Sequence, residues 1–422
     1  AGLRGGGGAA RGMSAPGEAG AATSRLPILF IMMTVMIDSM GIGLILPVLP
    51  DLILELNGGT LAAAAIWGGI LSTSFAVMQF LCGPLLGALS DTYGRRPVLL
   101  LSVGVLAVDY LVMAVAGTIW LLLAARIVAG ITGATQSTAT AFLADISAPH
   151  EKAARFGLVG ASFGLGFVLG PLLGGLLGEM GTRAPFYAAA GLAGLNLVLG
   201  WLVLPETVTD ATRRPFRWRA ANPLGAVRHL DRLDGVRVLL AVYFLYQLAF
   251  YVYPATWAYF TQARFGWDPG VIGISLAIFG VSMAAVQGAL IRPAQRRLGE
   301  PLMVRSGLAL CIAAFVTLAA LTDGRAALAL IPVAALGAVV APSLQALMSR
   351  ATPDDEQGAL QGVLTSVNAV AVILAPLVMT GTFAAFTHPD APVYLPGAAF
   401  LLSAVLVAAG LVLFVRRGPS AA

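Results

Sequence analysis

Apolar runs of about 20 residues recur along almost the whole chain, separated by short polar stretches. A helix rises about 1.5 Å per residue, so a run of this length crosses the hydrocarbon core of a bilayer, which is about 30 Å thick. The pattern predicts an all-α membrane protein with twelve transmembrane helices. The runs lie at 26–46, 62–89, 97–117, 119–144, 156–180, 185–204, 236–260, 270–291, 301–321, 326–349, 357–387 and 393–415.

A longer polar stretch after the sixth run divides the chain into two halves of similar size. The first residues are rich in Gly and Ala without apolar periodicity, which predicts a disordered tail; Met13 is the candidate native start after an added leader. The predicted units are a cytoplasmic tail at 1–25, a six-helix bundle at 26–204, a cytoplasmic linker at 205–235, a second six-helix bundle at 236–415 and a short cytoplasmic tail at 416–422.

The two halves are related by a displacement of about 205 residues. This displacement places Gly94 on Gly299 and aligns two short basic loops, SDTYGRRP at 90–97 and PAQRRLGEP at 293–301. A duplicated six-helix unit is typical of transporters whose halves rock about a central substrate site. The sequence therefore predicts two pseudo-symmetric bundles with a small-molecule substrate between them.

Charge is scarce and unevenly placed. The chain is 58% hydrophobic and 11% charged, against about a quarter charged in soluble domains. Of its 25 Lys and Arg residues, 20 fall on the side shared by both termini, whereas Arg183, Arg264 and Arg325 fall on the other. Positive charge marks cytoplasmic loops, so both termini are predicted to be cytoplasmic. The basic linker lacks interleaved aromatic residues, which argues against a nucleic-acid partner.

Catalytic and metal-binding chemistry has little support in the sequence. The three histidines, His150, His229 and His388, fall in predicted loops, and Cys82 and Cys311 stand far apart in apolar runs. No spans carry paired acids, metal ligands or a nucleophile beside a base. We therefore expect no enzyme activity, no cofactor and no metal.

Three charged residues lie deep in predicted spans, where charges are costly and usually functional. Asp38 is about 18 Å into the first span, close to the midplane. Asp109 and Arg126 both lie about 10 to 12 Å from the outer ends of the third and fourth spans, so they can pair. Asp109 and Arg126 either form a structural ion pair or contact the substrate, and the sequence does not distinguish the two roles. Asp38 and Asp109 are the candidate proton-coupling residues, and with Arg126 they are also candidates for the substrate cavity. Asp38 has no cation at similar depth nearby in sequence, which favours it as the proton carrier.

Polar and aromatic residues in other spans are candidates for the substrate cavity. The seventh span carries Tyr243, Tyr246, Gln247 and Phe250, which either line a pocket for a flat lipophilic ligand or pack within the bundle. Gln287 and Asn368 are buried polar groups that either join helices or contact the ligand. Gln136, in the fourth span, completes the predicted lining.

Four segments resemble motifs of the major facilitator superfamily, in particular the twelve-span drug:proton antiporters and, among these, the tetracycline exporters. The loop GALSDTYGRRPVLL at 87–100 is similar to the family's cytoplasmic loop signature, and the likeness covers residues 26 to about 415. The other segments are DSMGIGLILPVLPDL at 38–52, RIVAGITGATQSTATAFLADIS at 126–147 and GLGFVLGPLLGG at 164–175.

In the loop, Asp91 and Arg95 flank a tight turn at Gly94, between helices that meet at their cytoplasmic ends. The resemblance implies that Asp91 faces the start of the eleventh span near Gly358, and that Asp145 completes a charge relay to Arg95. A carboxylate at a helix N-terminus is favourable. The predicted cytoplasmic gate comprises Gly87, Asp91, Gly94, Arg95, Arg96 and Asp145.

The segment GLGFVLGPLLGG repeats glycine every fourth residue, at Gly166, Gly170 and Gly174, which leaves one helix face without side chains. A partner backbone can approach this face closely, and Pro171 bends the helix there. Generic packing of small residues also fits the pattern. The resemblance implies that such a seam accompanies antiport.

The resemblance implies a proton-coupled antiporter that exports lipophilic or cationic drugs from a bacterial inner membrane, as a single chain in the lipid bilayer. Tetracycline exporters carry a histidine in the eighth span and a carboxylate in the ninth, where Met283 and Cys311 stand here, so the substrate is open. The alternative is a facilitative or proton-coupled transporter of a metabolite such as a sugar or organic acid.

Overall fold

The computed structural model describes residues 25–210, 213–216 and 234–417. Almost all of the predicted N-terminal tail, with Met13, lies outside the described residues. Most of the predicted linker and the last five residues of the chain also lie outside them. The described residues form α-helices, short 3-10 helices and one π-helical turn, and no strand is found among them.

The first half contains eight helices in the described residues. They are α1 (Arg25–Ile45), α2 (Leu49–Asn57), α3 (Leu61–Tyr93), α4 (Arg95–Val115), α5 (Ile119–Thr132), α6 (Thr135–Ile146), α7 (Lys152–Gly178) and α8 (Ala184–Val203).

The second half contains a further eight helices in the part of the chain that the structure describes. They are α9 (Arg237–Phe250), α10 (Val252–Phe265), α11 (Pro269–Ala285), α12 (Ile291–Ala320), α13 (Gly324–Ala335), α14 (Val340–Ala351), α15 (Gln357–Thr387) and α16 (Ala398–Arg417).

The described helices make twelve crossings of a membrane. Eleven are long and apolar enough to span a bilayer, and one of these, Pro269–Ala320, has 52 residues. At about 1.5 Å per residue it is more than twice as long as the hydrocarbon core is thick. Its backbone leaves the helical conformation at Gly299, where φ is 71° and ψ is 160°, so it contains two spans. The predicted all-α fold with twelve spans is confirmed.

Breaks in the helices repeat between the halves. The first span is interrupted between Ile45 and Leu49, and the seventh is interrupted at Tyr251, about 205 residues later. The fourth span breaks at Gly133, and the tenth has a 3-10 turn, Leu336–Val339, at the corresponding place. The internal repeat is therefore visible in the backbone as well as in the sequence.

We name the two ends of the molecule by their charge. The basic end carries Arg25, Arg417 and the loops that join α3 to α4, α6 to α7 and α14 to α15, together with the bend at Gly299. The distal end carries the opposite loops. Four spans that begin at the distal end are preceded by a capping residue. Its side-chain oxygen accepts a hydrogen bond from a backbone N–H of the first turn, which has no acceptor within the helix. The caps are Thr60, Thr118, Asp268 and Asp323.

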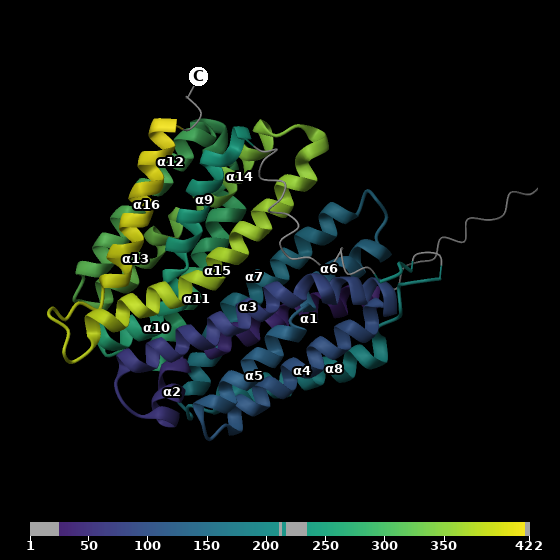
Figure 1. The fold of residues 1–422 in the computed structure, drawn as a ribbon, viewed down its shortest axis with the longest axis horizontal. Helices are drawn as coiled ribbons and strands as arrows, with labels where there is room; N and C mark the ends of the chain where they lie inside the picture. Colours follow the sequence, from purple (N-terminus) through teal and green to yellow (C-terminus); the bar gives the residue numbers. More distant parts are fainter. Residues whose placement is uncertain (1–24, 211–212, 217–233, 418–422) are drawn as a thin grey trace, which may run out of the picture.

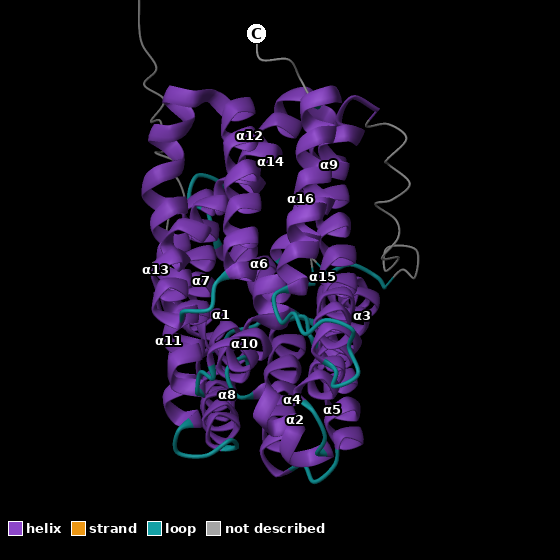
Figure 2. Ribbon diagram, turned by 90° about the vertical axis from the view of Figure 1, so that its left-hand side faces the viewer, coloured by secondary structure: helices purple, strands orange, loops and turns teal. Residues whose placement is uncertain are grey.

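The helices form two bundles that meet at an angle (Figure 1). Figure 2, turned by 90°, shows α9, α12, α14 and α16 in one bundle and α2, α4 and α5 in the other. Across the halves, α7 packs on α11 and α3 packs on α15, with smaller contacts from α10 to α2 and α3. These elements position the sites described next.

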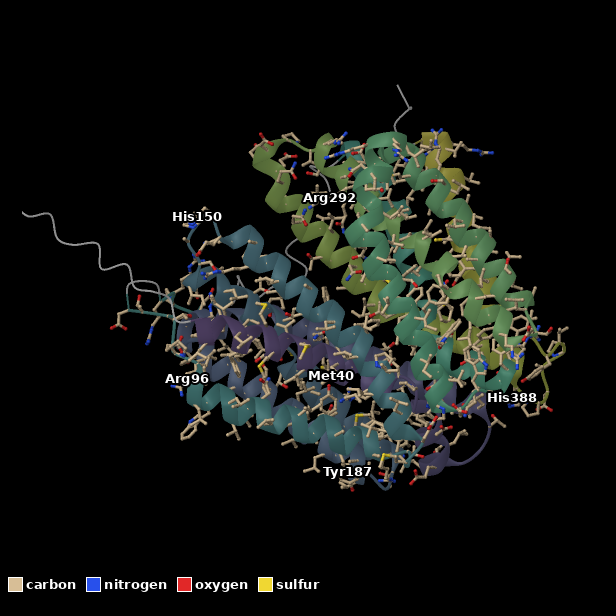
Figure 3. All side chains as sticks on the ribbon, turned by 180° about the vertical axis from the view of Figure 1, so that it is seen from behind. Met40, Arg96, His150, Tyr187, Arg292 and His388 are labelled. Carbon is tan, nitrogen blue, oxygen red and sulfur yellow. The ribbon has the colours of Figure 1, made fainter. Side chains whose placement is uncertain are left out.

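The bundles meet at the distal end and diverge toward the basic end. Thr73 donates to the Ile373 carbonyl at 2.9 Å, Gly175 packs on α11 beside Gly273, and Gln262 reaches Asp51. In Figure 1 the bundle ends near α6 and α14 lie apart, and in Figure 3 His150 and Arg292 lie on different bundles. The molecule is therefore closed at the distal end and open at the basic end.

Candidate functional site

Asp38 lies near the middle of α1 and is partly accessible. In the described part of the chain its carboxylate has no hydrogen bond and no ion pair. The Tyr110 side chain lies close enough for an electrostatic interaction, and its hydroxyl packs against Gly41, one turn further along α1. Asp38 is thus a carboxylate inside the membrane without a cationic partner, which is costly while it carries a charge.

The helix that carries Asp38 is in close contact with α7 through the glycine face. A Cβ at Gly166 would meet the Met36 carbonyl oxygen, and Cβ atoms at Gly170 and Gly174 would meet the carbonyl oxygens of Met40 and Leu44. The seam predicted from the sequence therefore has α1 as its partner, and only glycine allows this approach of the two backbones.

The opposite side of α7 packs on the second half. A Cβ at Gly273 of α11 would meet the Pro171 carbonyl oxygen and would lie 2.9 Å from the Gly175 Cα atom. Pro171 also contacts Gly43 of α1. Helix α7 thus lies between the Asp38 helix and the second bundle.

Asp109 and Arg126 form an ion pair between α4 and α5. The Arg126 Nε atom donates to Asp109 Oδ1 at 3.3 Å, and Arg126 Nη2 pairs with Asp109 Oδ2. Asp109 is buried, and the guanidinium carbon lies 5.5 Å from the centre of the Phe75 ring. Because each charge is compensated by the other, this pair differs from Asp38 in its chemistry.

The second-half candidates mostly hold helices together. Gln247 donates to Asn368 Oδ1 at 2.5 Å, and Tyr246 donates from its hydroxyl to the Gly337 carbonyl at 3.1 Å. Gln345 donates to the Tyr243 hydroxyl at 3.2 Å. These contacts favour the packing interpretation for Tyr246, which is fully buried.

Around them lies an aromatic cluster, of which only Tyr246 and Phe250 were expected at the site from the sequence. Phe250 is partly accessible and stacks on Tyr246, with ring centres 5.3 Å apart. Its other face meets Tyr253, which also contacts Phe279 and Phe315. Phe250 is thus the accessible member of an otherwise packed cluster.

Two predicted cavity residues stand apart from this group. Gln136 on α6 and Gln287 in the π-helical turn Val286–Leu290 are exposed. In the described part of the chain neither side chain makes a hydrogen bond. Among the described residues, no hydrogen bond joins either side chain to Asp38 or to the polar pair Gln247 and Asn368.

At the basic end, Arg95 joins two helix ends within the first half. Its Nη1 atom lies 2.5 Å from Asp91 Oδ1, and its Nε atom donates to Asp145 Oδ2 at 3.1 Å. Gly94 adopts φ of 118°, a backbone conformation that favours glycine, and this turn separates α3 from α4. Near Gly358, on α15, a Cβ would meet nothing within 4 Å. Because the bundles are apart at this end, the implied contact of Asp91 with α15 is not made in this state.

The other predicted gate residues have separate surroundings. Arg96 donates from Nη2 to the Trp201 carbonyl at 2.6 Å, which ties α4 to the end of α8. Gly87 is half-buried on α3, and a Cβ there would meet nothing within 4 Å.

Glu206 is a member of this network that sequence reasoning missed. Its carboxylate accepts the backbone N–H groups of Arg95, at 2.9 Å, and Arg96, at 3.3 Å, and so caps the start of α4. An acid at a helix N-terminus is favourable because it meets free donors and the positive end of the helix dipole. The signal available in the sequence was an acid directly after a span, where the loop otherwise carries basic residues.

A polar contact at the distal end was also missed. Gln262 Nε2 of α10 donates to Asp51 Oδ1 of α2 at 2.7 Å. Tyr259, one turn before Gln262, is buried against Gly68 of α3 and interacts electrostatically with Asp51. This group, which we call the distal clasp, joins the halves where they meet.

Metal ligation finds no support in the described residues, which hold no group of three or more His, Cys, Asp or Glu side chains placed to bind an ion. The chemistry available inside the spans is therefore that of Asp38 and of the ion pair between Asp109 and Arg126.

Comparisons with known proteins agree with this architecture. The sequence profile of the Major Facilitator Superfamily matches residues 31–376 and 239–422. The chain is similar to the class C tetracycline resistance protein of Escherichia coli, with 42% identity over 358 residues, which are 85% of this chain and 90% of the relative. It is 40% identical to the class G tetracycline resistance protein of Vibrio anguillarum over 363 residues, 86% of this chain and 91% of the relative. The fold is similar to that of the human organic anion transporter MFSD10 (TETRAN), with a TM-score of 0.66, 28% identity, and coverage of 93% of this chain and 99% of that chain.

Proposed function

Because this chain belongs to the Major Facilitator Superfamily, we propose that it is a proton-coupled antiporter that exports small lipophilic or cationic compounds by alternating access. The observation that carries this proposal is the state of Asp38, a carboxylate near the middle of α1 without a cationic partner among the described residues. Protonation removes the cost of its charge in the membrane, and a cationic substrate does the same. The two ligands therefore compete for one group, which is the requirement for exchange.

Coupling to movement follows from the position of α7. Its glycine face is locked to the backbone of α1, and its other face packs on Gly273 of α11. When the bundles rock, α7 moves against one of these neighbours, and the surroundings of Asp38 change with it. The glycine seam thus supports a shared role for Gly166, Gly170, Pro171 and Gly174 in exchange.

We assign the basic end to the cytoplasm, with both termini there, because positive charge concentrates in cytoplasmic loops. The state described is then open to the cytoplasm and closed outside by the distal clasp. In the other state the bundles meet at the basic end, where Asp91, Arg95 and Asp145 bring helix ends together. The protein works as a single chain of two bundles, with bounds near 204 and 236, in a bacterial inner membrane.

The substrate class follows from what lies between the halves. The predicted spans of the second half carry no Asp or Glu, and Asp109 in the first half is paired with Arg126, so the acidic group for a cation is Asp38. The accessible ring of Phe250 and the pair Gln247 and Asn368 offer apolar and polar surface for a flat compound. Tetracycline is the first compound to test, because the relatives named above are tetracycline resistance proteins.

The experiment is proton release from purified protein on addition of a compound panel that includes tetracycline. We expect the wild type to release protons with its substrate, the Asp38→Asn variant to release none, and the Asp210→Asn variant to behave as the wild type. Asp210 is a matched control because it is a fully exposed carboxylate near the linker. Proton release by Asp38→Asn equal to that of the wild type would overturn the assignment. Transport of a sugar or organic acid without proton movement would support a facilitator instead.

A further inference from the structure

An arginine near the basic end of the ninth span has no acidic partner among the described residues. Arg305 lies just inside the predicted span 301–321, which carries no Asp or Glu. Its Nε atom is buried and has no hydrogen-bond acceptor in the part of the chain that the structure describes. A charge inside a span is costly unless another group compensates it. An anion from outside the chain would supply the compensation that Arg305 lacks.

The Arg305 guanidinium is held against α16 close to the end of that helix. Its central carbon lies 6.0 Å from the centre of the Phe414 ring, within reach of the attraction between a cation and an aromatic face. The Arg305 backbone lies about 6 Å inside the start of the span. Helical side chains lean toward the N-terminus of their helix, and this span begins at the basic end. The guanidinium is therefore directed toward the membrane surface, to the depth of the lipid head groups.

Two more arginines lie at the end of the neighbouring helix. The last turn of α16 carries Arg416 and Arg417, and both side chains are exposed. Arg417 follows Phe414 by three residues, so it lies on the same face of α16, one turn nearer the basic end. Phe414 thus has Arg305 against its ring and Arg417 on the next turn, and the three arginines gather positive charge at the basic end of α12 and α16.

Deeper in the membrane, the exposed surface of the same two helices is apolar. It carries Ala309, Ala313 and Val316 on α12, and Val405 and Val412 on α16. Helix α16 packs on α9, α10, α12 and α15, which all belong to the second half, and it lies at the edge of that bundle away from the first (Figure 1). This surface therefore faces the lipid and lies away from the space between the halves.

We propose that the basic end of α12 and α16 binds the head group of an anionic phospholipid. The lipid phosphate accepts hydrogen bonds from Arg305, while Arg416 and Arg417 complete the cationic site and the acyl chains lie along the apolar surface. Arginine suits this ligand because its planar guanidinium can donate two parallel hydrogen bonds to a phosphate. Basic residues between spans on the cytoplasmic side bind acidic head groups in this way. The site is independent of the transported compound, and its place in the cytoplasmic leaflet rests on the proposed orientation.

The test measures lipid binding to the purified protein in detergent by native mass spectrometry. The probes are phosphatidylglycerol, which is anionic, and phosphatidylcholine, which is zwitterionic. We expect the wild type to bind phosphatidylglycerol more tightly than phosphatidylcholine. Arg305→Gln should weaken phosphatidylglycerol binding about fivefold, because one arginine near an acidic head group contributes about 1 kcal/mol. It should leave phosphatidylcholine binding unchanged.

Two further variants separate this site from total charge and from loss of folding. Arg292→Gln is the matched control, because it removes one positive charge from an exposed position on α12 before the bend at Gly299. Its affinity for phosphatidylglycerol should match that of the wild type. The double variant with Arg416→Gln and Arg417→Gln changes only exposed residues at a helix end, so it tests the site even if Arg305→Gln does not fold. It should also weaken phosphatidylglycerol binding, by about fivefold or more.

Three results would overturn the proposal. The first is equal affinity of the wild type for the two lipids. The second is a loss of affinity in Arg292→Gln as large as in Arg305→Gln, which would show that total charge binds the lipid. The third is displacement of phosphatidylglycerol by inorganic phosphate, which would indicate a site for a free anion. We expect no displacement, because inorganic phosphate lacks the acyl chains that the apolar surface binds.

Discussion

Gln262 of the second half donates a 2.7 Å hydrogen bond to Asp51 of the first half, and this contact joins the two bundles at the distal end. The bond lies where α10 meets α2, at the opposite end from the ion pairs of Arg95 with Asp91 and Asp145. Opening of the distal end has to break it and expose Asp51 to water. In the state described, the distal end is thus held by contacts between the halves, whereas the Arg95 ion pairs at the basic end lie within the first half.

Closure of the distal end should depend on pH through Asp51. Burial raises the pKa of the Asp51 carboxyl above its ordinary value, and the Gln262 hydrogen bond offsets part of this rise. The closed state therefore binds the proton more tightly than the open state, so acidification through the range between the two pKa values favours closure. Besides Gln262, Tyr259 faces the carboxyl.

Labelling of a cysteine at Ser72, which lines a pocket between the halves at this end, measures the open fraction. In the wild type we expect labelling from outside to decrease as the pH is lowered through that range. In Asp51→Asn we expect labelling that does not change with pH. An unchanged pH dependence in Asp51→Asn would show that another group controls closure.

The glycine seam should tolerate no side chain at Gly170. A Cβ there would lie 2.9 Å from the Gly43 Cα atom, so Gly170→Ala forces α1 and α7 apart. Overpacking of this kind costs about 1–3 kcal/mol, and we expect a lower thermal unfolding temperature and slower turnover. Gly164→Ala, on the same helix where a Cβ meets nothing within 4 Å, is the matched control and should leave both unchanged. Equal behaviour of the two variants would contradict the seam.

The ion pair between Asp109 and Arg126 should matter for stability more than for substrate affinity. Arg126→Met leaves the buried Asp109 carboxylate without compensation, which costs about 3–5 kcal/mol. The double variant with Asp109→Asn should recover much of this loss, because no buried charge remains. Thermal unfolding in detergent checks both. A normal unfolding temperature together with lost substrate affinity in Arg126→Met would favour substrate contact instead.

Membrane orientation can be checked at two exposed positions on opposite ends. Met180 lies at the distal end after α7, and His150 lies at the basic end before it. A cysteine at Met180 should react with an impermeant reagent only from outside, and a cysteine at His150 only from the cytoplasm. The reverse pattern would contradict the cytoplasmic assignment of the basic end.

The sequence predicted the spans, the repeat and the glycine face because each depends on local regularities. The length of an apolar run matches the thickness of the bilayer. Glycine at every fourth position leaves one helix face without side chains, whichever helix packs against that face. The helix that packs on this glycine face could not be predicted, because the approach of α7 to Met36, Met40 and Leu44 depends on how α1 is placed in space.

Long-range polar contacts were predicted less well. Asp51 and Gln262 are joined across 211 residues, and nothing in either local sequence indicates the other. Glu206 was missed for a similar reason, because the donors that it caps lie about 110 residues earlier. Gln136 and Gln287 were placed in the cavity from polarity alone, and their part in its lining stays a prediction. Asp109 and Arg126 were accessible to prediction because both depths could be counted from a short loop.

The dependence of substrate affinity on pH, in the wild type and in Asp38→Asn, tests the central claim most directly. If proton and substrate compete for Asp38, affinity in the wild type rises as pH rises, and Asp38→Asn binds with an affinity that no longer changes with pH. Phe250→Ala, which removes ring surface and changes no charge, should weaken binding equally at every pH. A full pH dependence retained in Asp38→Asn would place the proton site elsewhere and contradict the account.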